Sequence, residues 1–511
     1  MYSFLSRRQF LTTAAALGTI GSPLPILQGR SLAANNTAPT RLIAARRTIN
    51  VNGKPASVFG IHHPDGTPGL VLDPGKRFDL ILENQTSEPT IVHWHGQTPP
   101  VRQDGVVDTG LETPIESHGS QRYDFVPRAG TYWMHSHHGL QEQLLLAAPL
   151  IVRTEDDLHS DAQDVTVLLH DFTFRDPAEI LAQLTGRVAT AQDSMAMPSS
   201  HADMKGMHGM DMQGMTMNRR APTPTVATPA GPGTSKTGMV IDLNDIAFDA
   251  YLTNDRTLAD PLVVRAERNG RVRLRLINGA TSTAFWIELG QLTGTVVAVD
   301  GDPVKPVLVR RIPLAEAQRV DITVQLPPAG GAFAVLAQRE GDRQRTGFVL
   351  ATPNAPVRRI GDLAKEMIGP VDLSLERRLE ATHPLPARPP DIVHEIALTG
   401  TMMSYRWSIN DRIWAEHEPL MVRQGQRVEL EIINRTQMAH PMHLHGHHFQ
   451  VVALDGQPVR GPMRDTVFVP VNGSVRIAFD ADNPGRWLFH CHNLYHMATG
   501  MMTEVAYDHF T

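Results

Sequence analysis

Three short segments of the chain share one pattern, and this repetition constrains the fold more than any other feature. Each segment has a glycine or charged lead-in, then alternating apolar residues, then a closing asparagine; they are residues 77–84, 270–278 and 425–434. An apolar residue at every second position is typical of a strand with one buried face. Because the copies lie about 155 to 195 residues apart, we predict an all-β fold of three consecutive β-sandwich domains.

The 511 residues are enough for three such domains, and two stretches interrupt the strand pattern. One is a low-complexity, methionine-rich insertion, and the other is a charged stretch, proline-rich near its end, that is typical of a linker. Helical periodicity is scarce, and residues 177–184 are the best candidate for a helix. The predicted parts are a signal peptide (1–34), a first domain (40–154), a second domain (155–351) with the insertion (195–233), a linker (352–390) and a third domain (391–511).

The N-terminus carries an export pattern. Arg7 and Arg8 precede a mildly apolar run over residues 11–27, which glycines and prolines interrupt, and small residues follow at Ala33 and Ala34. Such a run is too short and too broken to span a bilayer, so we predict a cleaved twin-arginine signal and a periplasmic protein. The alternative is a cytosolic N-terminal helix that happens to contain two arginines. No later run reaches 18 apolar residues, and we expect no stable membrane insertion.

Composition excludes one class of function and favours another. The 47 basic and 53 acidic residues give a net charge of −6, which offers no basic surface for nucleic acid. The chain has 24 histidines and 21 methionines but a single cysteine, Cys491. One cysteine cannot form an intrachain disulfide, so its function must be thiolate chemistry or metal binding. These counts indicate a protein that binds a soft metal.

The histidines gather in four clusters, and each cluster contains two histidines separated by one residue. These pairs are His93 and His95, His135 and His137, His443 and His445, and His490 and His492. On a strand, residues two positions apart face the same way, so each pair directs two imidazoles to one place. Together the pairs supply eight imidazoles to a shared site, which suits three metal ions and is too many for one.

Cys491 lies between the histidines of the last pair and must therefore face away from them. His440 and His496 are free imidazoles within reach, and Met501 offers a thioether. A thiolate, two imidazoles and a weak thioether are the ligands of a blue-copper electron-transfer centre. Residues 490–492 then serve two sites at once and form a short electron path between them, as four-electron reduction of O2 requires. Zinc is the alternative metal, but a closed zinc site takes four ligands and prefers no axial methionine.

These clusters resemble the signatures of the multicopper oxidases, three-domain proteins of the cupredoxin-like Greek-key fold that include laccases and cuprous oxidases. The likeness covers nearly the whole mature chain. The leader, the Gly-Leu-Gln-Glu-Gln sequence at 139–143 and the methionine-rich insertion are most similar to the copper-resistance protein A and bacterial laccase-like branch. The resemblance implies four copper ions: type 1 on His440, Cys491, His496 and Met501, type 2 on His93 and His443, and a type 3 pair on His95, His135, His137, His445, His490 and His492.

Reduction of O2 to water consumes four protons, so an acid is expected near the eight-histidine site. Electron transfer is assigned to His490, Cys491 and His492, and proton transfer to Asp104, where the family often keeps an acid; the alternative is an Asp-Gly turn. Bacterial relatives often have a glutamate after the last type 1 histidine, but this chain has Met497 there. Histidines off the pattern are expected around the site or at the surface (His138, His447 and His448) or stay unassigned (His62, His63, His118 and His394).

The donor that the enzyme oxidises is open between two classes. An axial methionine predicts a moderate type 1 potential, so poorly reducing phenols would be slow substrates. The insertion holds eight methionines within residues 195–217, together with His201 and His208. Thioethers prefer Cu(I), which favours copper recruitment by this segment. The alternative is a tether in which methionine is incidental.

We therefore predict a monomeric, periplasmic multicopper oxidase that takes electrons from Cu(I) or from phenols and aromatic amines. It passes them to O2 in a role in copper tolerance, and we expect no nucleic-acid partner. One alternative is a dedicated laccase, and another is a copper-sequestering protein with little turnover. A copper-free structural protein of the same fold is a third class, but such relatives have lost ligand histidines, which this chain retains.

Overall fold

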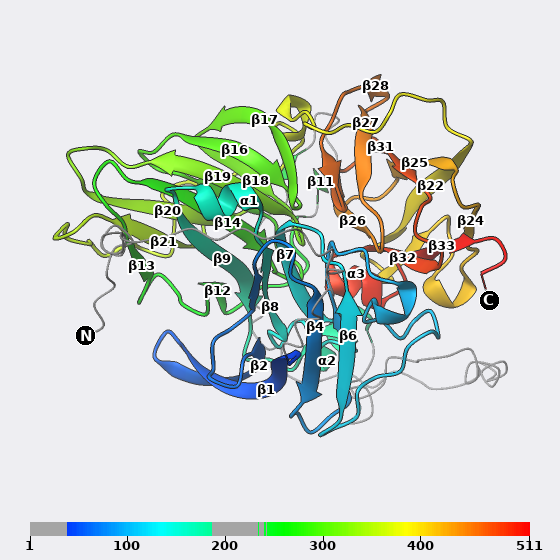
Figure 1. Cartoon of the computed structure of the whole chain (residues 1–511), viewed down its shortest axis with the longest axis horizontal. Helices are drawn as coiled ribbons and strands as arrows, with labels where there is room; N and C mark the ends of the chain where they lie inside the picture. The colour runs from blue at the N-terminus through cyan, green and yellow to red at the C-terminus, as the bar shows by residue number, and fades with distance from the viewer. Residues whose placement is uncertain (1–37, 187–232, 235–239, 242, 511) are drawn as a thin grey trace, which may run out of the picture. The chain divides into compact units, whose positions relative to one another are not determined.

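The computed structural model describes residues 38–186, 233–234, 240–241 and 243–510. The predicted signal peptide and the methionine-rich residues 195–217 lie outside the described residues. The rest forms three two-sheet sandwiches in chain order, coloured blue to cyan, green to yellow and yellow to red in Figure 1. The predicted all-β fold of consecutive sandwich domains is confirmed.

The strands of each sandwich divide between two sheets. In the first sandwich, β1 (Thr40–Val51), β2 (Lys54–His62), β4 (Phe78–Asn84) and β6 (Ser120–Phe125) face β3 (Leu70–Leu72), β5 (Val92–His93), β7 (Gly130–Ser136) and β8 (Ala147–Val152). In the second, β9 (Gln163–Phe172), β12 (Ala250–Thr253), β14 (Arg271–Asn278), β16 (Gly294–Val299), β17 (Asp302–Val309) and β19 (Arg319–Gln325) face β13 (Leu262–Arg265), β15 (Phe285–Glu288), β18 (Arg311–Leu314), β20 (Ala332–Arg339) and β21 (Arg345–Ala351).

The third sandwich has the same plan. Its first sheet contains β22 (Ile392–Thr401), β23 (Arg406–Ile409), β25 (Arg427–Asn434), β27 (Phe449–Leu454), β28 (Gln457–Pro458), β29 (Met463–Arg464) and β31 (Ser474–Asp480). Its second sheet contains β24 (Leu420–Val422), β26 (His440–Leu444), β30 (Thr466–Val469), β32 (Arg486–Cys491) and β33 (Met502–Tyr507). A separate pair joins β10 (Gly233–Thr234) to β11 (Val240–Ile241).

The three repeated segments of the sequence are equivalent strands of the three sandwiches. They are β4, β14 and β25, and each pairs in parallel with the first strand of its sandwich, namely β1, β9 and β22. In β4 every second residue is buried, as the alternation predicts, because one face packs on the core. Each sandwich therefore repeats one topology around one strand pattern.

The asparagine that closes each repeat holds the loop that follows the strand. Asn84 and Asn434 each donate from Nδ2 to backbone carbonyls across the loop and accept the backbone N–H two residues on. Asn278 makes the same kind of contacts in the second sandwich. In the first and third sandwiches this loop leads directly to the strand with the first histidine of a cluster. In these two sandwiches the repeated asparagine thus positions the start of the histidine-bearing strands.

Helices are few and short among the described residues: α1 (Glu155–His159), α2 (Pro177–Leu184), α3 (Leu494–Ala498), η2 (Val101–Gln103), η4 (Glu376–Arg378) and η5 (Trp414–Glu416). Helix α2 covers the candidate range, starts at the cap residue Asp176 and carries proline at its first position. Residues 352–390 contain η4 and bury apolar side chains such as Val371 and Leu375, so this stretch packs against the domains that it joins. No helix in the described part of the chain is long and apolar enough to cross a membrane.

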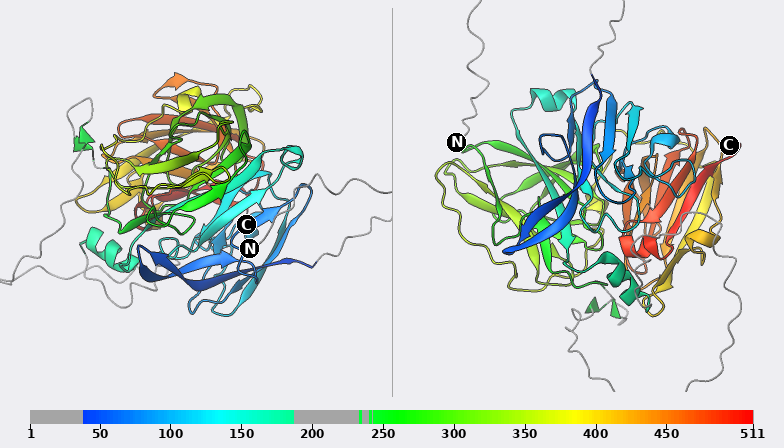
Figure 2. Two further views of the ribbon diagram at one scale, coloured as in Figure 1. Left: turned by 90° about the vertical axis from the view of Figure 1, so that its left-hand side faces the viewer. Right: turned by 90° about the horizontal axis from the view of Figure 1, so that it is seen from below.

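The sandwiches share a buried junction. One apolar cluster runs through the second and third sandwiches, whereas most of the first sandwich has its own core. Strand β7 of the first sandwich contacts β14 and β19 of the second, and the loop at Gly96 receives a hydrogen bond from His448 of the third. Both views in Figure 2 show the first sandwich, in blue to cyan, against the other two. Histidines of the first and third sandwiches meet at this junction.

Candidate metal centre

Two antiparallel strand pairs carry the His-x-His pairs into the interior. His93 on β5 lies directly opposite His135 on β7, and His443 on β26 lies opposite His490 on β32. Opposite residues of antiparallel strands project from the same face. The second histidine of each pair follows just beyond the strand, on the same side as its partner. The first and third sandwiches therefore each present four imidazoles from two neighbouring strands.

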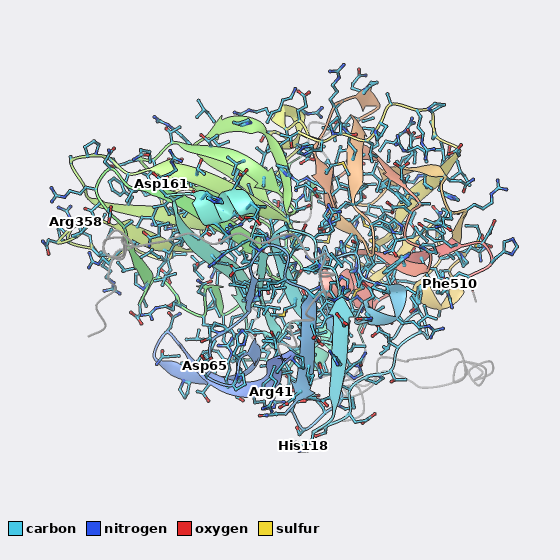
Figure 3. The ribbon with its side chains drawn as sticks, viewed as in Figure 1. Arg41, Asp65, His118, Asp161, Arg358 and Phe510 are labelled. Atoms are coloured by element: carbon cyan, nitrogen blue, oxygen red, sulfur yellow. The ribbon has the colours of Figure 1, made fainter. Side chains whose placement is uncertain are left out.

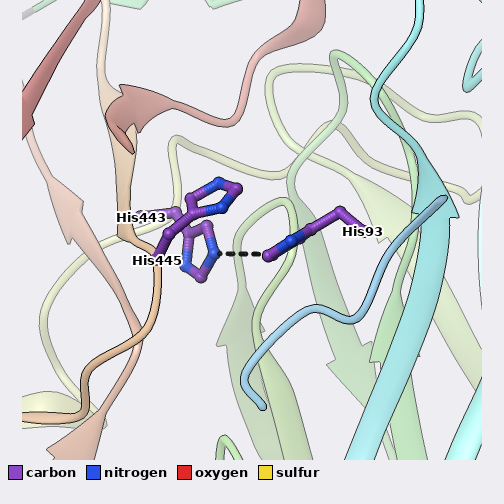
Figure 4. A group of neighbouring side chains, drawn as sticks. All are labelled: His93, His443 and His445. Carbon is purple, nitrogen blue, oxygen red and sulfur yellow. Dashed lines mark hydrogen bonds between the residues drawn. The ribbon is translucent and has the colours of Figure 1, made fainter. Parts of the chain in front are cut away.

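The eight histidines converge on one buried region. Their ring nitrogens form three groups, and within each group the nitrogens lie within 4.8 Å of one another. The groups are His93, His443 and His445; His95, His135 and His492; and His137, His445 and His490. Each group joins histidines of the first and third sandwiches, so neither sandwich can form the site alone. Figure 4 shows the first group, with 3.4 Å between His93 Nε2 and His443 Nε2.

Hydrogen bonds determine which nitrogen of a ring carries the proton. His93 Nδ1 lies 2.8 Å from the carbonyl oxygen of Asp104, and His443 Nδ1 lies 2.8 Å from that of Asp465. A carbonyl oxygen can only accept, so both Nδ1 atoms donate and both Nε2 atoms present lone pairs to each other. Facing lone pairs repel unless they share a cation, and this arrangement fits a metal ion between the rings.

Four other ring nitrogens point to the same conclusion. His95 Nδ1, His135 Nε2, His137 Nε2 and His492 Nε2 are buried and have no hydrogen-bond partner within the described chain. Buried polar atoms are rarely left unpaired, and four such nitrogens in one buried region fit a bound metal. Burial, followed by the neighbouring imidazoles, holds the pKa well below its usual value in His95, His135, His445, His490 and His492. The rings are therefore neutral, which is the form that binds metal.

A second, smaller group lies on the other face of β26 and β32. Cys491 is opposite Met442 in the register, one position from the His443–His490 pair, so its side chain faces away from the eight histidines. Cys491 Sγ lies 3.6 Å from His440 Nδ1 and 3.7 Å from His496 Nδ1. The two Nδ1 atoms are 3.1 Å apart. One thiol and two imidazoles thus converge as a blue-copper site requires.

The ligand candidates of this second group are fully enclosed. Cys491 and His496 are inaccessible to solvent, and so is Met501, whose carbonyl oxygen accepts the backbone N–H of Cys491 at 3.0 Å. Burial raises the pKa of the Cys491 thiol well above its usual value. A buried thiolate needs a compensating positive charge, so the deprotonated form depends on a bound cation.

A carboxylate of the second sandwich hydrogen-bonds one imidazole of this group on the side away from Cys491. His496 Nε2 donates to Asp245 Oδ2 at 3.0 Å, and the Tyr405 hydroxyl donates to the same oxygen. His440 Nε2 makes a 2.7 Å hydrogen bond with Thr436 Oγ1. With their Nε2 atoms occupied, both rings present Nδ1 to Cys491. The Trp407 ring packs 4.2 Å from the His496 ring, which further restricts its orientation.

Asp104 lies beside the larger cluster. It follows η2 and is 1% exposed, and its Oδ2 accepts the His445 Nδ1–H at 2.8 Å. The chain bends at Asp104, and Gly105 after it has φ +81°. This bend directs the Asp104 carboxylate to the His445 ring. Met497 is half-buried and places no carboxyl beside His496.

The histidines off the pattern fall into two kinds. His447 is buried, with its Nε2 2.7 Å from the Tyr507 hydroxyl, and His448 Nε2 donates to the Gly96 carbonyl oxygen at 2.7 Å. Both therefore belong to the packing around the cluster. His118 is exposed at the edge of the first sandwich, as its label in Figure 3 shows. His62, His63, His138 and His394 are half-buried.

Sequence reasoning gave no role to three buried carboxylates that contact these histidines. Glu142 Oε2 lies 2.9 Å from His135 Nδ1, and Asp465 Oδ1 lies 3.1 Å from His95 Nε2. The third is Asp245, which is described above. The Gln-Glu-Gln sequence after the second cluster was a signal for Glu142, because a carboxylate so close to His-x-His fits hydrogen bonding to a ligand ring. Asp465 and Asp245 lie far from their histidines in the sequence and carry no such signal.

Comparison with known proteins identifies the family. Models of the multicopper oxidase family match residues 44–157, 163–354 and 387–509. The chain is 34% identical to the multicopper oxidase MmcO of Mycobacterium tuberculosis, over 85% of this chain and 80% of that protein. It is 26% identical to copper resistance protein A of Pseudomonas syringae pv. tomato, over 99% of this chain and all of the relative.

The fold agrees with that family. The crystal structure of the laccase from Botrytis aclada aligns with a TM-score of 0.69 at 21% identity, covering 91% of this chain and 87% of the laccase. The three matched regions together span most of the chain, and each contains one sandwich. The chain therefore belongs to the multicopper oxidases, copper-dependent oxidoreductases that use O2.

Proposed function

We propose that this protein holds four copper ions and couples one-electron oxidation of a donor to the four-electron reduction of O2 to water. One observation carries the proposal. His490 and His492 belong to the eight-histidine cluster, while Cys491 between them faces His440 and His496. A mononuclear site and a trinuclear site then share three consecutive residues. The proposed ligands are His440, Cys491, His496 and Met501 for type 1, His93 and His443 for type 2, and His95, His135, His137, His445, His490 and His492 for type 3.

Bound copper supplies the one-electron redox chemistry at both sites. The chain holds the two ligand groups on opposite faces of one strand pair and joins them covalently through residues 490–492. It also buries every ligand candidate, which keeps bulk water away from the reduction of O2. We assign proton supply to Asp104, because its Oδ2 contacts His445 and its Oδ1 has no hydrogen-bond partner in the described chain.

We further propose that the donors are Cu(I) and phenols or aromatic amines, and that the protein acts in copper tolerance in the periplasm after twin-arginine export. The relative named copper resistance protein A and the laccases among the similar proteins support these two donor classes. The Arg7-Arg8 leader supports the location. The eight methionines of residues 195–217 support Cu(I) as a donor.

The test is a visible spectrum of the copper-reconstituted protein, with O2 uptake measured for Cu(I) and a dimethoxyphenol in parallel. A thiolate–copper bond absorbs strongly at about 600 nm. We expect a blue protein that consumes O2 with either donor, and the ratio of the two rates assigns the donor class. A protein that binds copper but consumes no O2 would be a copper store, the second candidate function that the methionine-rich segment favours.

A further inference from the structure

The second sandwich supplies none of the proposed ligands, yet one of its side chains reaches the eight-histidine cluster. Arg319, on β19, is fully buried at the junction of the three sandwiches. Its Nη1 donates to Asp465 Oδ1 at 2.7 Å, and its Nη2 donates to Asp465 Oδ2. Its Nε donates to the Thr131 carbonyl oxygen of the first sandwich at 3.3 Å. The guanidinium thus binds Asp465 with both arms, a geometry that fixes the carboxylate plane.

Asp465 in turn determines how His95 faces the cluster. His95 Nε2 lies 3.1 Å from Asp465 Oδ1 and 3.1 Å from Thr466 Oγ1. Because Arg319 holds Asp465 as a carboxylate, this oxygen accepts, and the His95 proton belongs on Nε2. His95 Nδ1 is then the free nitrogen, and it is one of the buried atoms without a partner in the described chain. His93, by contrast, keeps its proton on Nδ1.

Behind Arg319 the buried charges alternate in sign. Arg319 Nη1 lies 3.7 Å from Asp300 Oδ1, and Arg464 Nη1 lies 3.2 Å from Asp300 Oδ2. Arg464 Nη2 continues the chain to Glu376 Oε2 at 2.8 Å. Glu376 belongs to the stretch that joins the second and third sandwiches. These four groups and Asp465 are all buried, so the positions of the charges are fixed by their mutual attraction in a medium of low dielectric constant.

In the first sandwich, the missing side chain of Gly96 leaves space for the Arg319–Asp465 ion pair. Gly96 directly follows His95, and a Cβ there would collide with Asp465 Oδ2 and lie 2.7 Å from Arg319 Nη2. The ion pair from the other two sandwiches therefore occupies the space beside the His95 backbone that any larger residue would fill. Residues of all three sandwiches therefore act together to restrict the orientation of the His95 ring.

We propose that Arg319 of the second sandwich, acting through Asp465, selects the Nε2-protonated form of His95 and so directs His95 Nδ1 to the metal. Arg319 and Asp465 are positioning residues in this proposal, which rests on the proposed copper function. Groups that orient a metal-binding histidine typically contribute 10–100-fold to metal affinity. We therefore expect Asp465→Asn and Arg319→Met each to weaken copper binding at the trinuclear site by about 10–100-fold, and Arg319→Lys to restore part of the loss.

Copper affinity is measured by chelator competition, with the type 3 absorption and the copper-to-protein ratio as signals. The blue absorption of the Cys491 site should persist, which separates a local effect from unfolding. Asp321→Asn is the matched control, because Asp321 lies two residues from Arg319 on β19, is about as buried as Asp465 and pairs with Arg273 and Arg275 without contacting a proposed ligand. Unchanged trinuclear affinity in Asp465→Asn, or an equal loss in Asp321→Asn, would overturn the proposal.

A second measurement reads the wild-type protein directly, and a variant serves only to assign the signals. The copper-free wild-type protein is labelled with 15N-histidine, and the nitrogen shifts of His95, assigned by loss of its signals in His95→Gln, report where the proton lies. The proposal requires the proton on Nε2, and a proton on Nδ1 would refute it. Failure of the proposed function can be distinguished from failure of this inference. A protein that consumes no O2 can still show this tautomer and this dependence of copper affinity on Asp465.

Discussion

Replacing Gly96 with alanine tests how tightly the three sandwiches close around the histidine cluster. Gly96 has φ +82°, a left-handed conformation that costs a residue with a Cβ about 1–2 kcal/mol. The new Cβ would also collide with Asp465 Oδ2 and lie 2.7 Å from both Arg319 Nη2 and Tyr132 Cδ1. Forcing a methyl group into a packed interior costs about 1–3 kcal/mol more. We expect Gly96→Ala to destabilise the copper-free protein by about 2–5 kcal/mol.

Gly75 provides the matched control within the same sandwich. Its φ is +73°, but a Cβ there meets nothing within 4 Å. Gly75→Ala therefore carries the backbone cost, and the same change in unfolded-state entropy, without the collision. Urea unfolding of the copper-free proteins, followed by tryptophan fluorescence and circular dichroism, gives the two losses of free energy. Gly96→Ala should lose about 1–3 kcal/mol more than Gly75→Ala, and equal losses would refute the close packing of the three domains at this point.

Three further predictions concern the thiol, the insertion and a buried acid. Cys491→Ser should abolish the blue absorption and turnover while circular dichroism shows an intact fold; a variant that stays blue would contradict the ligand assignment. Deleting residues 195–217 should lower Cu(I) oxidation selectively, and an equal loss of phenol oxidation would argue for a tether. Burial raises the pKa of Glu316 to about 8 from an ordinary 4.5, so the folded protein retains a proton that the unfolded chain releases. The contribution of Glu316 to the free energy of unfolding should then fall by roughly 1.4 kcal/mol per pH unit as the pH rises from about 4.5 to about 8. In urea unfolding of the copper-free proteins, the pH dependence of Glu316→Gln should be shallower than that of the wild type by this slope, and equal pH dependence would contradict the prediction.

The repeated strand pattern predicted the fold because its signal is local. Alternation in residues 77–84 follows from one buried face, and the same sequence of lead-in, alternation and asparagine recurs in each sandwich. The closing asparagines had no assigned role in the sequence. The structure gives them one, because Asn84, Asn278 and Asn434 each bridge the loop after their strand. A hydrogen bond across a loop depends on where the chain returns, which a strand pattern does not specify.

The spacing of the histidines likewise settles only local geometry. A His-x-His pair on a strand places both rings on one side, and Cys491 between two such histidines must face the other way. The grouping of the rings, as in His95 with His135 and His492, depends on how the first and third sandwiches dock. No pattern within either sandwich contains that information.

The sequence by itself determined the fold class, the family and the kinds of candidate metal ligand, because strand alternation, His-x-His spacing and a single flanked cysteine act over a few residues. Only the tertiary structure decided which nitrogen of each ring is free. Asp465 is 370 positions from His95, Asp245 is 251 from His496, and Arg319 is 146 from Asp465. Contacts at such separations arise only when the three sandwiches pack together. In His95, His445 and His496, the nitrogen that carries the proton is then set by the carboxylate that another domain places beside the ring.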